Sequence, residues 1–226
     1  IELNGEIQIK GEQPVRINRR FTGAQSSALA SAALAAPLAA LLKANFGGME
    51  ITGVTLNMTA IDGSKTGVLD RITVDKNQVR PGDIVYITAF ERDEAGKITA
   101  RTIPYSVPKD TAAGPLTITV GDGNAVQQNA AITQFVPRSA AELIATMNSL
   151  KRPDRLYAVI SRTSTGAVIG SSEMPNLPPS MMATLNNDRT AGGSKPTVQT
   201  LIGEIELPAG GHVVTGTQTL SIEVLR

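Results

Sequence analysis

The segment VRPGDIVYITAFERDEAGKITARTIPYSVP, from Val79 to Pro108, carries two runs rich in β-branched residues, separated by a charged connection. Runs of this composition favour strands, and a short polar connection between them is typical of an antiparallel hairpin. The turn RPGD, Arg80 to Asp83, precedes the first run, because proline presets φ and glycine accepts a positive φ. Pro104 interrupts the second run, which therefore suits an edge strand. The segment predicts a β-hairpin without a reactive side chain.

The residues around this hairpin continue the strand pattern. LDRITVDKNQV precedes it and GPLTITVGDG follows it, so that about five to seven short strands fit into residues 64–136. Strands at such regular spacing predict an antiparallel β-sandwich of immunoglobulin-like type. Its core is expected to contain the inward residues of the alternation: Ile72, Val74, Ile84, Tyr86, Leu116, Ile118 and Val120.

The flanking residues 1–63 and 137–226 each combine strands with one helix. In the second of these segments, Ser139 and Glu142 form a capping-box pattern ahead of an apolar helical stripe. We expect the two segments to form one smaller, discontinuous α+β unit, with the sandwich inserted between them. Three modules in series is the alternative. The expected fold class is mainly β with some α.

The end of the first segment, MEITGVTLNMTAI, alternates apolar and polar residues from Met49 to Ile61. This alternation predicts a strand with one apolar face. Gly53 breaks the alternation, which predicts a β-bulge at that position.

An apolar run, ALASAALAAPLAALL, extends from Ala28 to Leu42 and follows the pair Arg19-Arg20. An arginine pair ahead of an apolar run resembles a secretion signal. The run is shorter than the roughly 20 residues that a bilayer span needs, and it contains Pro37. It also follows a strand-like segment. We therefore expect a buried helix and no membrane span.

The composition excludes several classes of function. The 226 residues carry a formal net charge of +1, which gives no electrostatic reason to expect a nucleic acid partner. Cysteine is absent, so disulfides, thiolate catalysis and thiolate metal sites are excluded. GDGNAV, from Gly121 to Val126, lacks the third glycine of a dinucleotide fingerprint and is interpreted as a turn. No cofactor and no metal site is expected.

The single histidine, His212, follows Gly210-Gly211. An independent hydrolase would have to use it, but no nucleophile motif accompanies it, and a surface-loop histidine is the preferred interpretation. A carbohydrate-binding sandwich is a further alternative. Sugar platforms usually stack on aromatic rings, and this chain offers only three tyrosines for that purpose and no tryptophan.

The segment PNLPPSMMATL contains the most unusual sequence of the chain. Prolines stiffen an extended segment, and adjacent methionines offer adaptable apolar contact. We identify a candidate partner contact here, with a loop packed on its own core as the alternative. The candidate residues are Leu177, Pro178, Pro179, Met181 and Met182.

Several phrases together carry a family resemblance: DRITVDKNQVRPGDIVYIT, GPLTITVGDG, RLYAVISR, LPPSMMATL and GEIELPAGGHVVTGTQTLSIEVL. Over nearly its whole length the chain resembles the C-terminal, non-catalytic region of bacterial, acidobacterial-type proteins of the SpoIVB-type serine peptidase family. In that family the peptidase module lies upstream of this region, and no catalytic motif of it is matched here. The resemblance implies an accessory or interaction region in an exported protein of the periplasm or cell envelope. Its expected partner is the upstream peptidase module or another envelope protein.

Overall fold

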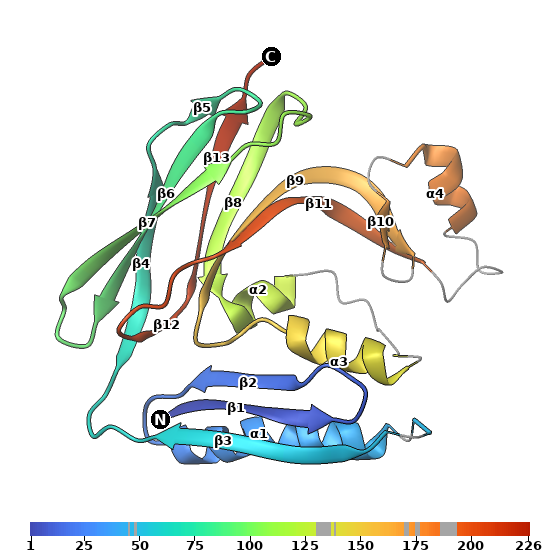
Figure 1. The fold of residues 1–226 in the computed structure, drawn as a ribbon. Coiled ribbons are helices and arrows are strands. Elements are labelled where there is room, and N and C mark those ends of the chain that lie inside the picture. The colour runs from blue at the N-terminus through green and yellow to red at the C-terminus, as the bar shows by residue number, and fades with distance from the viewer. Residues whose placement is uncertain are drawn as a thin grey trace.

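The computed structural model describes residues 1–44, 46–47, 49–129, 137, 139–169, 172–174, 177–185 and 194–226. The described chain is mainly β, with three sheets and four helices. A β-sandwich forms the upper part of Figure 1, and a small three-stranded sheet with two helices lies beneath it. The predicted fold class, a β-sandwich combined with a smaller unit containing helices, is confirmed.

The sandwich consists of two sheets that share one apolar core. One sheet has the strand order β12-β4-β6-β7, and the other has the order β10-β9-β8-β13-β5 with β11 paired to β9. Strands β6 and β7 are the antiparallel hairpin predicted from the opening segment. The bounds of these strands are β4 Thr66–Val74, β5 Gln78–Val79, β6 Ile84–Asp93, β7 Ile98–Ser106, β8 Gly114–Asp122, β9 Leu156–Ile169, β10 Ser172–Met174, β11 Ser194–Glu206, β12 Val213–Thr215 and β13 Thr217–Val224.

The predicted core of the sandwich is correct on β8 and wrong on β6. Leu116, Ile118 and Val120 are fully buried between the sheets. Ile84 and Tyr86, by contrast, are about half exposed. Their neighbours are the buried ones: Val85, Ile87 and Ala89. A shift of one residue in a strand moves every side chain to the other face, and both faces of β6 carry apolar residues. The two remaining predicted positions, Ile72 and Val74, are partly buried against the core.

Strand pairing departs from the expected division of the chain. Within residues 64–136, β8 pairs with β13 on one side and with β9 on the other. Both partners come from 137–226, which we expected to join 1–63 in an α+β unit. The sandwich core therefore contains residues from both segments, such as Ile160 and Ile222. The alternation within each strand was visible in the sequence, but the partner of each strand was not.

The lower unit is built from residues 1–63 and one helix of the later segment. Its sheet has the order β2-β1-β3 and is entirely antiparallel, with a bulge where β1 meets the Gly53 region as predicted. Helices α1 and α3 pack on the apolar face of this sheet. The bounds are β1 Glu2–Ile9, β2 Val15–Arg20, α1 Ser26–Lys43, β3 Ile51–Thr59 and α3 Ala140–Ser149.

Helix α1 forms as predicted but is not a buried helix. Ala30 and Leu41 are its only buried residues, and they join the core of the small sheet. Most of the remaining surface faces outward, including Leu29 and Leu42. A single sheet can cover only one side of a helix, so an alanine-rich helix placed at the surface leaves its other sides exposed. By length and composition α1 is the one described helix that is apolar enough to cross a membrane.

Two further helices test whether local sequence signals predict where a helix begins. The predicted capping box at α3 is confirmed, since the Ser139 hydroxyl accepts a hydrogen bond from the backbone N–H of Glu142. The predicted turn after Asp122 is wrong, because α2, Gly123–Asn129, begins there. The Asp122 carboxylate accepts hydrogen bonds from the first N–H groups of α2 and thereby starts the helix.

Candidate functional site

His212 lies at a small pocket of about 150 Å³ on the four-stranded sheet. The carboxylate of Glu91 is buried beside it and forms an ion pair with Arg101, whose guanidinium also donates to the carbonyl oxygen of Pro208. Burial lowers the pKa of Arg101, and the nearby positive charge of Arg155 lowers it further. Among the residues that line this pocket, the only hydroxyl belongs to Thr99.

This pocket offers little to a hydrolase. A histidine base acts on a nucleophile within hydrogen-bonding distance and is oriented by a third group. Of the two carboxylates in the lining, Glu91 is bound to Arg101, and Asp93 accepts a hydrogen bond from a backbone N–H of its own hairpin. Across the part of the chain that the structure describes, no group of three or more histidine and acidic residues is arranged to hold a metal ion.

A larger pocket of about 430 Å³ lies where the small sheet meets the sandwich. Its polar side chains bind one another and the backbone. Arg20 forms an ion pair with Glu2 at 2.7 Å and donates to the carbonyl oxygen of Gly210 at 2.7 Å. The hydroxyl of Thr22 accepts a hydrogen bond from the backbone N–H of Lys65 at 3.1 Å. The contacts to Gly210 and Lys65 cross between the two parts of the molecule and indicate a structural joint.

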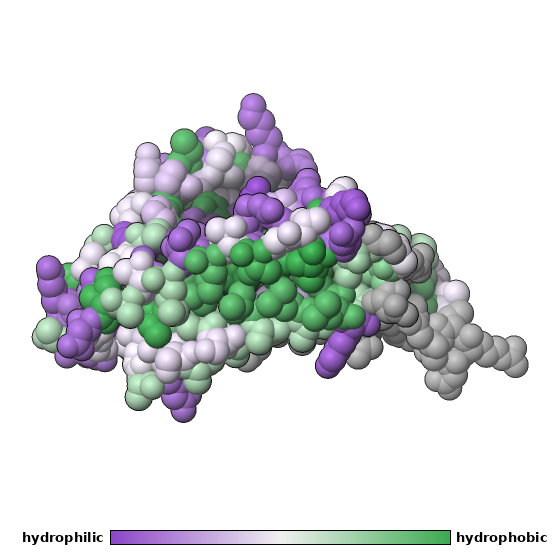
Figure 2. Space-filling view, turned by 60° about the horizontal axis from the view of Figure 1, so that its bottom comes forward, coloured by the Kyte–Doolittle hydropathy of each residue, from purple (hydrophilic) through white to green (hydrophobic). Residues whose placement is uncertain are grey.

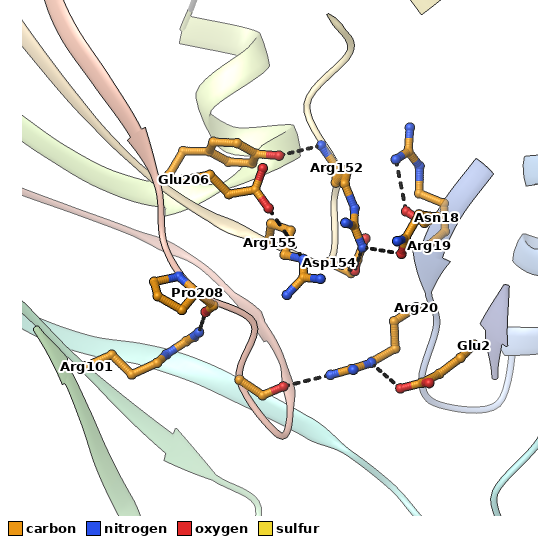
Figure 3. A network of polar contacts seen from close by, with 12 residues as sticks. Glu2, Asn18, Arg19, Arg20, Arg101, Arg152, Asp154, Arg155, Glu206 and Pro208 are labelled. Carbon is orange, nitrogen blue, oxygen red and sulfur yellow. Dashed lines mark hydrogen bonds and ion pairs between the residues drawn. The ribbon is translucent and has the colours of Figure 1, made fainter. Parts of the chain in front are cut away.

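The joint continues in a network of charged residues, shown in Figure 3. Arg152 donates to Asn18 of β2 at 2.7 Å and to the buried carboxylate of Asp154 at 3.0 Å. Arg155 lies between that carboxylate and Glu206 of β11. Burial lowers the pKa of Arg19 in the same region, although Asp154 partly offsets this effect. We call these residues the junction network: Asn18, Arg19, Arg20, Arg152, Asp154, Arg155 and Glu206.

The junction network holds the small sheet against the sandwich. Its arginines are engaged with carboxylates, an amide or a backbone carbonyl rather than converging on an empty space. Removing one partner from such a network would leave a buried charge uncompensated, which is costly. The network therefore explains how two separate cores stay in one arrangement.

The segment that we identified as a partner contact ends in a short helix rather than running extended. Helix α4, Pro179–Leu185, begins with a proline, which suits the first position of a helix. Met181 is half exposed, whereas Met182 is partly buried. Pro178 is exposed and Leu177 is partly buried. The two methionines therefore do not present one common surface.

A much larger apolar surface lies on the underside of the molecule, where β3 and α1 run side by side (Figure 2). We call its central part the β3 strip. The exposed fractions of its side chains are 47% for Val54, 36% for Leu56, 63% for Met58 and 56% for Ile61. Leu29 and Leu42 of α1 are also exposed apolar residues.

The register of the small sheet explains why the β3 strip is uncovered. Met58 lies opposite Leu3 of β1, and Val54 lies opposite Ile7. Residues opposite one another in an antiparallel pair point to the same face of the sheet. Leu3 and Ile7 are buried together with residues of β2 and α1. Strand β3 lies one strand further from the helices than β1 does. Its apolar side chains on that face are therefore not covered by them.

Sequence reasoning found the strand but missed the surface. The alternation of MEITGVTLNMTAI predicts an apolar face, and such a face is normally buried. Alternation does not show whether a strand lies at the edge of a sheet, so the exposure of this face was not predictable from the pattern. The tyrosines give no sugar platform among the described residues, because Tyr105 and Tyr157 are buried and only Tyr86 is exposed.

The fold and surface define a β-sandwich protein with a small appended sheet, whose most prominent apolar surface is the β3 strip. Comparisons with known proteins add no relative, since no protein-family model, curated protein or solved structure matches the chain. Inferences about function therefore rest on the residues themselves.

Proposed function

We propose that this chain is a non-catalytic accessory region that assembles a larger protein by binding another protein surface through the β3 strip. The observation that carries the proposal is the exposure of Val54, Leu56 and Met58 on an otherwise buried sheet face. Exposed apolar area costs about 25 cal/mol per Å² relative to burial. Contiguous exposed apolar surface in a folded protein typically marks an interaction site.

The resemblance to SpoIVB-type serine peptidase proteins supplies the setting of this proposal. In that setting the chain belongs to an exported protein of the periplasm or cell envelope, and the peptidase module lies upstream. The absence of cysteine is compatible with that location. The paired charges around His212 also favour an accessory role over an independent hydrolase.

The test measures whether the β3 strip is covered in the intact protein. A Met58→Cys variant introduces a single thiol into a chain without cysteine. We expect a maleimide reagent to label position 58 rapidly in this chain alone at low concentration and much more slowly in the full-length protein. Peptide mass spectrometry reads the labelling at that position.

The matched control is Met181→Cys on α4, because Met181 is exposed to a similar degree. Its labelling should be equal in both forms if only the β3 strip is covered. Equal, rapid labelling of position 58 in both forms would overturn the proposal. Protection at position 181 alone would transfer the contact to α4.

A further inference from the structure

We propose that the partner of the β3 strip is a second copy of this chain, whose β3 pairs with this β3 in antiparallel fashion about a two-fold axis. The two small sheets then join into one sheet of six strands. This inference rests on the proposed function, because it names the partner that binds beside the strip.

The outer edge of β3 is open to pairing. In the sheet order β2-β1-β3, β3 pairs only with β1 and has no second strand among the described residues. It runs for nine residues, Ile51–Thr59, with the sequence ITGVTLNMT. Natural edge strands usually carry a charge, a proline or a covering segment that prevents pairing. Strand β3 carries neither a charge nor a proline, and its bulge beside Gly53, a feature that also discourages edge pairing, lies outside the segment from Val54 to Met58.

The other edge of the same sheet is capped at one end. The side-chain amide of Asn148, on α3, accepts a hydrogen bond from the backbone N–H of Arg16 at 2.9 Å. It also donates to the carbonyl oxygen of Pro14 at 3.0 Å. This amide thus occupies the N–H of Arg16 in β2 and a carbonyl just before the strand, so a further strand would have to displace it to pair with that end of β2. The edge strand β7 of the sandwich, likewise, contains Pro104.

Strand β3 is also complementary to a second copy of itself in antiparallel pairing. With the two-fold axis at Leu56, that residue lies opposite Leu56 of the second copy, and Val54 lies opposite Met58 of the second copy. On the other face, Thr55 lies opposite Asn57 of the second copy. No charged pair arises along the strand, and apolar cross-strand pairs stabilise a sheet.

The two-fold symmetry also determines where the α1 helices lie relative to the strip. An axis perpendicular to the sheet leaves both α1 helices on one face, on either side of the doubled β3 strip. Such a contact is isologous, with the same patch on both copies. Stable interfaces bury about 800 Å² per partner, and one strand edge with four side chains is at the small end of this range. We therefore expect a dissociation constant on the order of micromolar.

The primary experiment measures the mass of the chain in solution. Sedimentation velocity at rising protein concentration should show a monomer converting to a dimer. Leu56→Lys should shift the midpoint of this conversion at least tenfold upward, because two lysines then meet on the axis. The control Met181→Lys should leave it unchanged. A thermal melt of each variant confirms folding, and Leu56 is sufficiently exposed to accept a lysine.

A monomer at all concentrations would overturn the inference, as would a dimer insensitive to Leu56→Lys. Cross-linking tests the register independently. Residues opposite one another have Cα atoms about 4.5–5.5 Å apart, within the range of a disulfide. Leu56→Cys should therefore form a covalent dimer on oxidation. Met58→Cys alone should not, whereas Met58→Cys combined with Val54→Cys should.

The outcomes also separate this inference from the proposed function. If the isolated chain stays monomeric while position 58 is protected in the full-length protein, the strip binds a different surface. That result overturns the second copy and leaves the accessory function standing. If position 58 is also unprotected in the full-length protein, both proposals fail.

Discussion

His212 is the residue on which an enzymatic function of this chain would depend. We expect the isolated chain to hydrolyse neither peptide nor ester substrates, because the Glu91 carboxylate of the pocket is held by Arg101 and the only lining hydroxyl is that of Thr99. The measurement compares the wild-type chain with His212→Ala on a broad substrate panel. Reproducible turnover that disappears in the variant would show that the pocket is catalytic.

Tyr105 is a second residue with a measurable consequence. Its ring lies inside the sandwich against Gly203, and its hydroxyl is buried without a hydrogen-bond partner among the described residues. Leaving such a group unpaired costs about 1–3 kcal/mol. We expect Tyr105→Phe to raise the free energy of unfolding by about 1 kcal/mol, as measured by urea denaturation at neutral pH.

The same residue makes stability depend on alkaline pH. Burial raises the pKa of Tyr105 above its ordinary value of about 10, so the folded state favours the neutral phenol. Its contribution to stability is complete below the unfolded pKa and is lost as pH rises through the folded pKa. Tyr105→Phe should therefore lose less stability above pH about 10 than the wild-type chain. An identical alkaline loss in both would contradict this assignment.

Single residues also show what a sequence can predict. The positions on β8 were correct because only one of its faces is strongly apolar. On β6 the choice between Ile84 and Ile87 was wrong, since both faces carry apolar residues and alternation alone does not say which face is inward. The opposite sheet makes that choice, and its position is not encoded locally.

At the scale of elements, the cap on β2 can be tested directly. Asn148→Ala removes two hydrogen bonds between α3 and the edge of β2. We expect the free energy of unfolding to fall by about 1 kcal/mol or more, because each bond contributes about 0.5–1.5 kcal/mol. The control Asn4→Ala alters an exposed asparagine on β1. Equal stability of the two variants would show that water replaces the amide without loss.

Elements with a local start signal were the most predictable. The helix after Ser139 has its cap and its apolar stripe within a few residues, and both were recognised. At Asp122 the same carboxylate chemistry starts α2, but the following glycine favoured a turn. A glycine is required there for another reason, since a Cβ on Gly123 would lie 2.2 Å from the carbonyl oxygen of Arg152.

At the scale of the whole molecule, long-range pairing was the limit of sequence reasoning. Strand β8 finds its neighbours about forty and one hundred residues further on, at Ile160 and Leu220 opposite Ile118. Local alternation carries no information on such partners, so the expected unit of 64–136 lacked half of its second sheet. The junction network was equally hidden, because its members come from β2, β11 and the loop before β9.

The two edges of the small sheet determine how many copies of the chain can associate. With β2 capped at one end by Asn148 and β3 open, the small sheet offers one fully open edge among the described residues, and the proposed pairing uses that edge once per chain. Under the proposed pairing, the first contact uses up that edge in both copies, and no third copy can add. A heterologous contact, or a sheet with two open edges, would instead allow copies to add without limit and form fibrils. Under the proposed pairing, the Asn148 amide on β2 therefore disfavours growth into a polymer.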